Sequence, residues 1–131
     1  MNNDQLQLVT LGQAEGLKEI GFDLKTNSYY VYENQDTAKV YSNWNELQNW
    51  NDTKKHDAYS APKVPLALKW ARDVKGIRLG VQFRYTGYYG HFNETDDRAN
   101  IIVLNGCDTY EQAESALLDA VIEELKKARK E

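Results

Sequence analysis

Residues 77 to 85 alternate between apolar side chains and positions that are polar or glycine. The apolar or aromatic positions are Ile77, Leu79, Val81, Phe83 and Tyr85. The positions between them are Arg78, Gly80, Gln82 and Arg84. Alternation with a period of two over this length predicts a β-strand that buries one face and leaves the other face polar.

A two-residue turn at residues 86–87 predicts that the chain then reverses and pairs residues 88–92 with this strand. Arginine binds phosphate or carboxylate through paired hydrogen bonds, and tyrosine stacks on a nucleotide base. A nucleotide-sized anion would suit the polar face of such a hairpin. The other interpretation is a solvated face that long arginine side chains merely cover. The candidate ligand-binding residues on this face are Arg78, Gln82, Arg84, Tyr89 and His91.

The first of three amphipathic segments covers residues 10–21. Thr10 and Gln13 have the spacing of a capping box, which predicts that the helix begins there. Gly12 and Gly16 each weaken the helix by about 1 kcal/mol relative to alanine. We therefore expect tertiary packing to stabilise this helix.

The second and third helices are predicted from their apolar stripes and end signals. The second starts near Ser60, has two prolines in its first turn and ends at Gly76. The third is capped by Asp108 and extends toward the C-terminus. The stripe predicted to be buried in the second helix is Val64, Ala67, Leu68, Ala71 and Val74.

The remaining strands complete the predicted fold. We expect residues 28–33 and 37–43 to form a hairpin. Residues 100–104, which are apolar from residue 101 onward, predict a strand in the centre of the sheet. The element order is then α-β-β-loop-α-β-β-β-α. We expect one α+β domain over residues 1–131, in which three helices pack on a mainly antiparallel sheet of about five strands.

The segment of residues 43–57 between the first hairpin and the second helix has no strand alternation. Trp44, Leu47 and Trp50 are spaced three apart, which permits one or two helical turns. Connections of this length are often functional. Trp44 and Trp50 are therefore candidate ligand-binding residues in a lid or partner-binding segment, and the alternative is an irregular connector attached to the core by its tryptophans.

The composition of the 131 residues narrows the classes of protein and partner. The net charge is -4, which argues against general nucleic-acid binding because that function needs a clustered basic face. No apolar run reaches the roughly 20 residues of a membrane helix, and the N-terminus lacks the pattern of a signal peptide. With Cys107 as the single cysteine, we expect a cytoplasmic protein that does not act at a membrane.

Residues that could carry out chemistry are few and scattered. Cys107 precedes a predicted helix N-terminus, where a thiolate would be stabilised. His56 and His91 do not have the spacing of metal ligands. The two aspartates Asp96 and Asp97 are expected to lie in a solvated turn. We therefore expect no metal, no cofactor and no catalytic residues, and a Cys107-dependent enzyme is the least favoured of the possible functions.

Several motifs occur at helix starts and on helix faces, and they are Tyr-Ser-Ala-Pro at residues 59–62, Leu-Ala-Leu-Lys-Trp-Ala-Arg at 66–72 and Cys-Asp-Thr-Tyr-Glu-Gln-Ala-Glu at 107–114. Together with a further match at 17–23, they resemble motifs of a family of small uncharacterised proteins of Bacteroides-type gut bacteria and their phages. They lie mostly at helix starts and on helix faces, so they specify the fold rather than an activity. The resemblance implies a phage or mobile-element setting in the bacterial cytoplasm.

From these observations we expect the protein to be a non-enzymatic accessory protein of a phage or mobile element that acts by binding. Its partner would be a small anionic ligand or a host protein. One specific form is a host-defence antagonist that sequesters a nucleotide-like signal. The alternative is an acidic protein–protein inhibitor, in which the loop with Glu94, Asp96 and Asp97 imitates nucleic acid and blocks a host nuclease.

Overall fold

The computed structural model describes residues 7–43, 47–52, 58–95, 97 and 99–129. The helices are α1 (Leu11–Glu19), α2 (Val64–Lys75) and α3 (Tyr110–Arg129), with a short 3-10 helix η2 (Trp50–Asp52). The strands are β1 (Ser28–Tyr32), β2 (Ala38–Ser42), β3 (Ala58–Ser60), β4 (Leu79–Arg84), β5 (Gly87–Asn93) and β6 (Ile101–Val103). No helix among the described residues has both the length and the apolar character that a membrane span requires.

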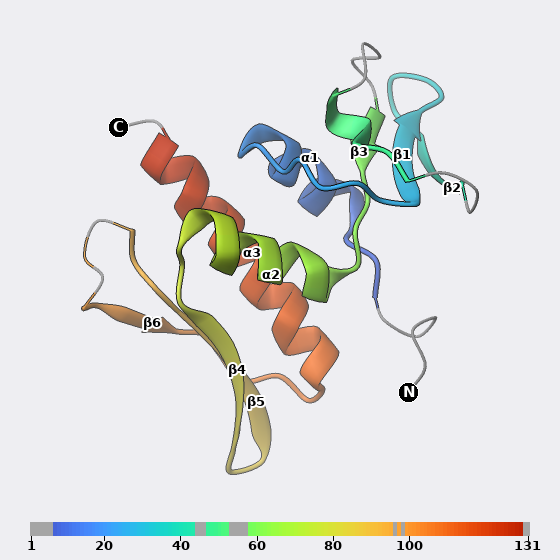
Figure 1. The fold of residues 1–131 in the computed structure, drawn as a ribbon. Helices are drawn as coiled ribbons and strands as arrows, with labels where there is room; N and C mark the ends of the chain where they lie inside the picture. The colour runs from blue at the N-terminus through green and yellow to red at the C-terminus, as the bar shows by residue number, and fades with distance from the viewer. Residues whose placement is uncertain (1–6, 44–46, 53–57, 96, 98, 130–131) are drawn as a thin grey trace.

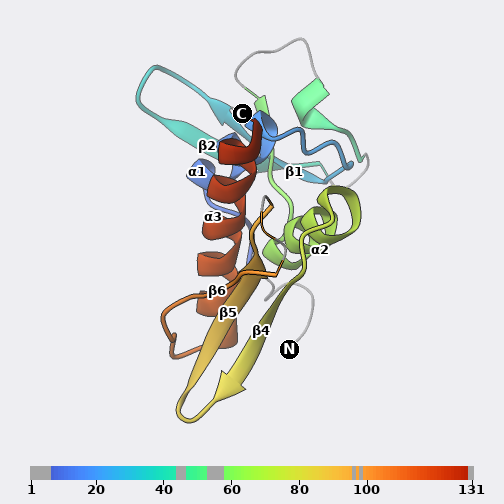
Figure 2. The same cartoon turned by 90° about the vertical axis from the view of Figure 1, so that its left-hand side faces the viewer.

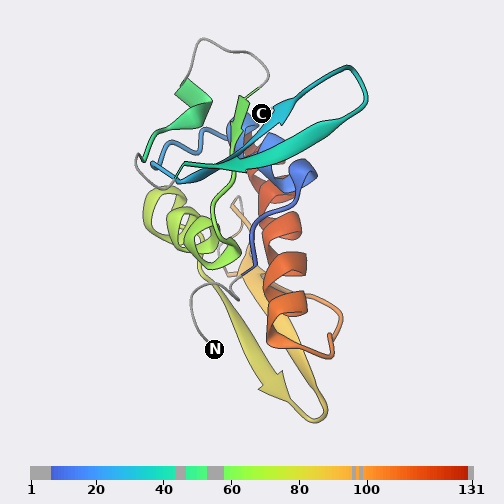
Figure 3. The same ribbon diagram turned by 90° about the vertical axis from the view of Figure 1, so that its right-hand side faces the viewer.

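The strands form two antiparallel sheets, with the orders β2-β1-β3 and β4-β5-β6. The two sheets lie at opposite ends of the molecule, and the helices lie between them (Figures 1, 2 and 3). The predicted α+β class and the antiparallel pairing are confirmed. The prediction of one sheet with about five strands is corrected to two sheets of three strands each.

The extra strand is β3, which the sequence prediction missed. Ser60 was expected to start the second helix, but it ends β3 and pairs with Tyr29 of β1. Helix α2 begins four residues later, at Val64, and Pro65 occupies its first turn, where a missing N–H costs no helical hydrogen bond. A three-residue strand is too short to show alternation, so this segment carried no strand signal.

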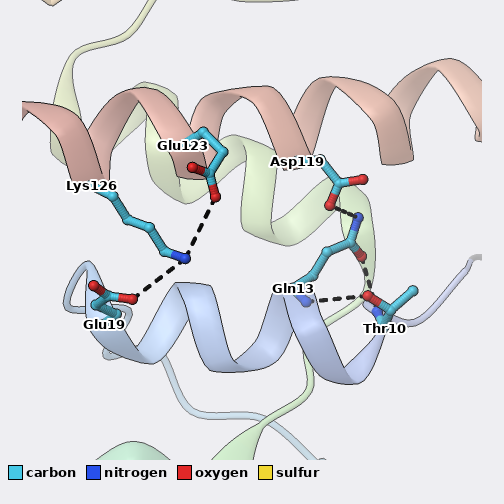
Figure 4. A network of polar contacts seen from close by, with 6 residues as sticks. All are labelled: Thr10, Gln13, Glu19, Asp119, Glu123 and Lys126. Atoms are coloured by element: carbon cyan, nitrogen blue, oxygen red, sulfur yellow. Dashed lines mark hydrogen bonds and ion pairs between the residues drawn. The ribbon is translucent and has the colours of Figure 1, made fainter.

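Helix α1 runs beside α3 in the same direction, and polar contacts link the two helices at both ends (Figure 4). The predicted capping box of Thr10 and Gln13 is confirmed. The Gln13 amide also donates to the Ser115 carbonyl oxygen at 3.1 Å and to Asp119 Oδ1 at 3.0 Å. Because Gln13 is buried, these hydrogen bonds satisfy an amide that would otherwise destabilise the fold.

Two helix details differ from the sequence prediction. The cap of α3 is Thr109, whose side chain accepts from the Gln112 backbone N–H at 3.1 Å, and not the preceding Asp108. A threonine with glutamine three residues later makes the reciprocal pair of a capping box. Val74, predicted to be buried, is 59% exposed, because it lies in the last turn of α2 at the surface.

Strand β6 lies at the edge of its sheet and not in the centre, because it pairs with β5 alone. Ile102 packs against the core, whereas Ile101 and Val103 are 61% and 63% exposed. A continuous apolar run is typical of a strand that is buried on both faces. Here the apolar side chains of the second face are exposed instead, next to the candidate site.

Candidate functional site

The second sheet has one face toward the helices and one face away from them. Gly90 of β5 lies on the helix side, where an added Cβ would be 3.1 Å from Leu117 Cβ of α3. Residues that pair directly across strands share a face. Gln82 pairs with Tyr89, and His91 pairs with both Gly80 and Val103. Tyr89 and His91 are the neighbours of Gly90 along β5, so their side chains project to the side away from α3.

The outward face contains a hollow of about 420 Å³. This volume is within the range of small-molecule sites, toward its lower end. Four of the predicted ligand-binding residues line it, and they are Gln82, Arg84, Tyr89 and His91. The lining also includes three residues that the sequence prediction did not select, namely Tyr85, Ile101 and Val103.

The other predicted site residues lie elsewhere or outside the described residues. Arg78 is exposed and is absent from the described lining, and its backbone N–H donates to Asn93 Oδ1 at 2.6 Å. Trp50 stacks on Tyr29 of the first sheet with ring centroids 3.9 Å apart, and its Nε1 donates to the Thr26 carbonyl oxygen at 2.9 Å. Trp50 is therefore anchored at the first sheet and does not join the hairpin residues, and Trp44 lies outside the described residues.

Two glycines allow the rings of His91 and Tyr89 to lie close to the backbone beside the hollow. A Cβ at Gly80 would lie 3.0 Å from His91 Nε2, and a Cβ at Gly106 would lie 3.0 Å from Cε1 and Cζ of Tyr89. Both distances are shorter than ordinary van der Waals contact. The missing side chains therefore allow His91 and Tyr89 to lie directly against the backbone.

The hairpin tip places an arginine beside an aromatic ring. The two turn residues are Tyr85 and Thr86, one position earlier than the predicted turn at 86–87. Tyr85 has φ +56°, a left-handed conformation that is rare for a large side chain. Because of this turn, Tyr85 borders the hollow and leaves the apolar face where the alternation had placed it. The Arg84 guanidinium carbon lies 5.7 Å from the centre of the Tyr85 ring, within the range of a cation–π interaction.

The chemical character of the hollow changes along the strands. Arg84 at the hairpin tip is the one arginine or lysine among its described lining residues. Gln82, Tyr89 and His91 follow, and each can donate a hydrogen bond. Ile101 and Val103 add apolar surface on β6. The arrangement can therefore bind a ligand that has both an anionic and an apolar part.

A smaller crevice of about 200 Å³ lies on the helix side of β4. Its lining includes Arg72, Tyr110 and Glu114. Burial raises the pKa of the Glu114 carboxyl above its ordinary value, and the nearby charge of Glu111 raises it further. Burial likewise raises the pKa of the Tyr110 phenol, with smaller effects from the same two carboxylates.

The residues considered for catalysis and acidic mimicry are placed as follows. The Cys107 backbone pairs with Tyr88, and its Sγ lies 3.9 Å from the Asn105 carbonyl oxygen. The described residues contain no group of three His, Cys, Asp or Glu side chains able to hold a metal ion. Glu94 donates its backbone N–H to the Asn100 carbonyl oxygen at 3.1 Å, and Asp97 is exposed. His56 and Asp96 lie outside the described residues.

Taken together, the described residues define a small α+β protein with a ligand-sized hollow on the outward face of a three-stranded sheet. No protein-family model, curated protein or solved structure matches the chain. The resemblance to small phage-associated proteins therefore stays a prediction from the sequence motifs.

Proposed function

We propose that this protein is a non-enzymatic binding protein that holds a small, nucleotide-like anion on the outward face of the second sheet. The observation that carries the proposal is the single hollow in which Arg84, Gln82 and His91 meet two tyrosines. A few polar groups that converge within an otherwise apolar or aromatic hollow are typical of ligand sites.

Each lining side chain has a distinct role in this proposal. Arg84 binds the anionic group through its planar pair of N–H donors. Gln82 and His91 supply hydrogen bonds that orient the ligand. Tyr89, whose ring lies close to Gly106, offers an aromatic surface between the arginine and the apolar end of the hollow. The ligand would thus be recognised by shape and charge together.

The backbone of Tyr85 supports the same proposal. A tyrosine at φ +56° carries conformational strain that glycine or asparagine would reduce. Strained backbone positions that the surrounding structure maintains are often functional. The Tyr85 ring borders the hollow and lies beside Arg84, so a contribution to the ligand site accounts for a tyrosine at this turn.

The biological setting is proposed from the sequence resemblance alone. The motifs at residues 59–62, 66–72 and 107–114 resemble those of small proteins of gut bacteria and their phages. In that setting, a protein that sequesters a nucleotide-like signal in the cytoplasm would act as a host-defence antagonist.

A host protein is the second partner that we propose. The rings of Phe83, Tyr88 and Tyr110 form a cluster at the hairpin tip, with centroids 4.9 Å and 5.9 Å apart, and Phe83 is 62% exposed. Exposed aromatic clusters are enriched in protein interfaces. Binding that persists at high salt would indicate contact through these rings, whereas binding lost with salt would indicate the acidic loop at Glu94 and Asp97.

A calorimetric screen of small anions tests the main proposal. We expect at least one nucleotide-like anion to bind the wild-type chain, and Arg84→Gln to weaken binding about ten- to a hundredfold, since charge-assisted hydrogen bonds contribute about 1.5–3 kcal/mol. Arg78→Gln is the matched control, because Arg78 is exposed and outside the described lining of the hollow. Equal losses in the two variants, or no binding of any anion, would contradict the proposal.

A further inference from the structure

We infer that the ligand combines one planar ring with one anionic group, placed at opposite ends of the hollow. This inference rests on the proposed function and adds the chemical class of the ligand. A nucleoside monophosphate and an aromatic carboxylate both have this chemistry. Nucleoside di- and triphosphates, and uncharged rings, do not.

The first observation is the separation of charged and apolar groups along the strands. Arg84 lies at the hairpin tip, and His91 and Val103 lie level with Gly80 on β4. Four residues of extended strand separate the two levels, which corresponds to about 13 Å. The long arginine side chain covers part of this span, and a ligand with two separate groups can contact both levels, whereas a free inorganic anion is too small to do so.

The second observation concerns the apolar end. Val103 lies next to His91 on the same face, and Ile101 lies beyond it on β6. Both β6 side chains are more than half exposed, so covering them removes apolar surface from water. The His91 ring lies close to the backbone of Gly80, on the same face as these two side chains. This end therefore suits a planar ring rather than a second charged group.

The third observation is the count of positive charges. Arg84 is the one permanent cation among the described lining residues, and the chain carries a net charge of -4. A chain of phosphates needs several cations or a metal ion to balance its charge. One arginine matches one phosphate or carboxylate, which it binds through two parallel hydrogen bonds.

Calorimetry on the full chain with five probes tests this inference. The probes are adenosine, AMP, ATP without metal, inorganic phosphate and 2-naphthoate. We expect AMP to bind about tenfold or more tightly than adenosine or phosphate, and ATP to bind no more tightly than AMP. Binding of 2-naphthoate similar to that of AMP would identify the ring and the anion as the shared requirement, whereas tighter binding of AMP would identify the nucleotide as the source.

Two substitutions assign the ends. Arg84→Gln should reduce AMP binding to the level of adenosine, and Val103→Asp should reduce the binding of AMP and 2-naphthoate about tenfold, because it places a carboxylate at the ring end. Arg78→Gln should leave all affinities unchanged.

The outcomes separate the inference from the proposed function. If ATP binds far more tightly than AMP, or phosphate binds as tightly as AMP, an anion site exists and the inferred ligand class is wrong. If none of the probes binds, the proposed function fails as well. Unchanged AMP affinity in Val103→Asp would contradict the placement of the ring.

Discussion

A Cβ atom added to Gly16 of α1 would lie 2.6 Å from Ile122 Cγ2 of α3, so glycine permits the two helices to pack at their observed separation. Gly16 and Ile122 are both buried. The close contact explains why a residue that disfavours helix occupies the middle of α1. Packing against α3 therefore provides the tertiary stabilisation that we expected for this glycine-containing helix.

The two glycines of α1 should respond in opposite directions to alanine. Gly16→Ala should lower the free energy of unfolding by about 1–3 kcal/mol, because the core must shift to admit the methyl group. Gly12→Ala should raise it by about 0.5–1 kcal/mol, since the nearest atom to a Cβ at residue 12 is Thr10 Oγ1 at 4.0 Å. Urea denaturation of both variants measures the difference. Equal stabilisation by the two substitutions would show that the helices are farther apart than described.

The position of His91 can be changed without altering His91 itself. Gly80→Ala places a methyl group 3.0 Å from His91 Nε2, and the ring can rotate away because it is the end of a side chain. We expect weaker ligand binding with little loss of stability, measured by calorimetry and thermal denaturation. NMR chemical shifts of the His91 ring check the displacement directly. Unchanged shifts together with unchanged affinity would contradict the role of Gly80.

The strained turn at Tyr85 predicts that stability and binding change in opposite directions. Tyr85→Asn should raise the free energy of unfolding by about 1 kcal/mol, because asparagine tolerates the left-handed conformation better. The same variant should bind the ligand more weakly, since it removes a ring from the hollow. Thr86→Asn, at the second turn position, is the matched control and should leave affinity unchanged. A Tyr85→Asn variant that gains stability and keeps full affinity would remove the functional explanation of the strain.

The raised pKa of Glu114 predicts a pH-dependent effect on stability. Because burial raises its folded-state pKa above 4.5, the folded chain binds this proton more tightly than the unfolded chain does. The stability that this proton provides is present below pH 4.5 and is lost as the pH rises through the folded-state pKa. Glu114→Gln should therefore raise the melting temperature at pH 7, and the gain should shrink as the pH falls toward 4.5. Thermal denaturation between pH 4.5 and pH 7 measures whether the change in melting temperature has this direction.

Glu123→Gln is a control on the same helix, because the Glu123 side chain is 75% exposed. It should show no comparable gain at pH 7, since exposed ion pairs contribute little to stability. A gain in Glu114→Gln that stays constant from pH 7 to pH 4 would mean that the effect does not arise from the carboxyl group.

The hairpin of β4 and β5 was predictable from the sequence because alternation and a short turn are local signals. They also selected Gln82, Arg84, Tyr89 and His91, which the structure brings together in one hollow. Strand β3 was not predictable, since three residues are too few to show a period. The division into two sheets was not predictable either, since it depends on which strands pair, and local alternation does not specify the partners.

Other features of the predicted site residues depend on tertiary contacts that no local pattern shows. The spacing of Trp50 permits a helical turn but does not specify the sheet on which its ring stacks. Gly80 lies close to His91 because the two residues pair across the strands, and the sequence alone does not specify this register. The segment of residues 100–104 was predicted to lie in the centre of the sheet because composition alone does not show whether apolar side chains are buried or exposed.

The outward face of the second sheet lies away from α3, so most of its side chains contribute little to the core. Under the proposed function, substitutions at Gln82, Arg84 or Val103 would therefore change the preferred ligand while leaving the core intact. Selection would then be able to exchange one ligand for another by single substitutions.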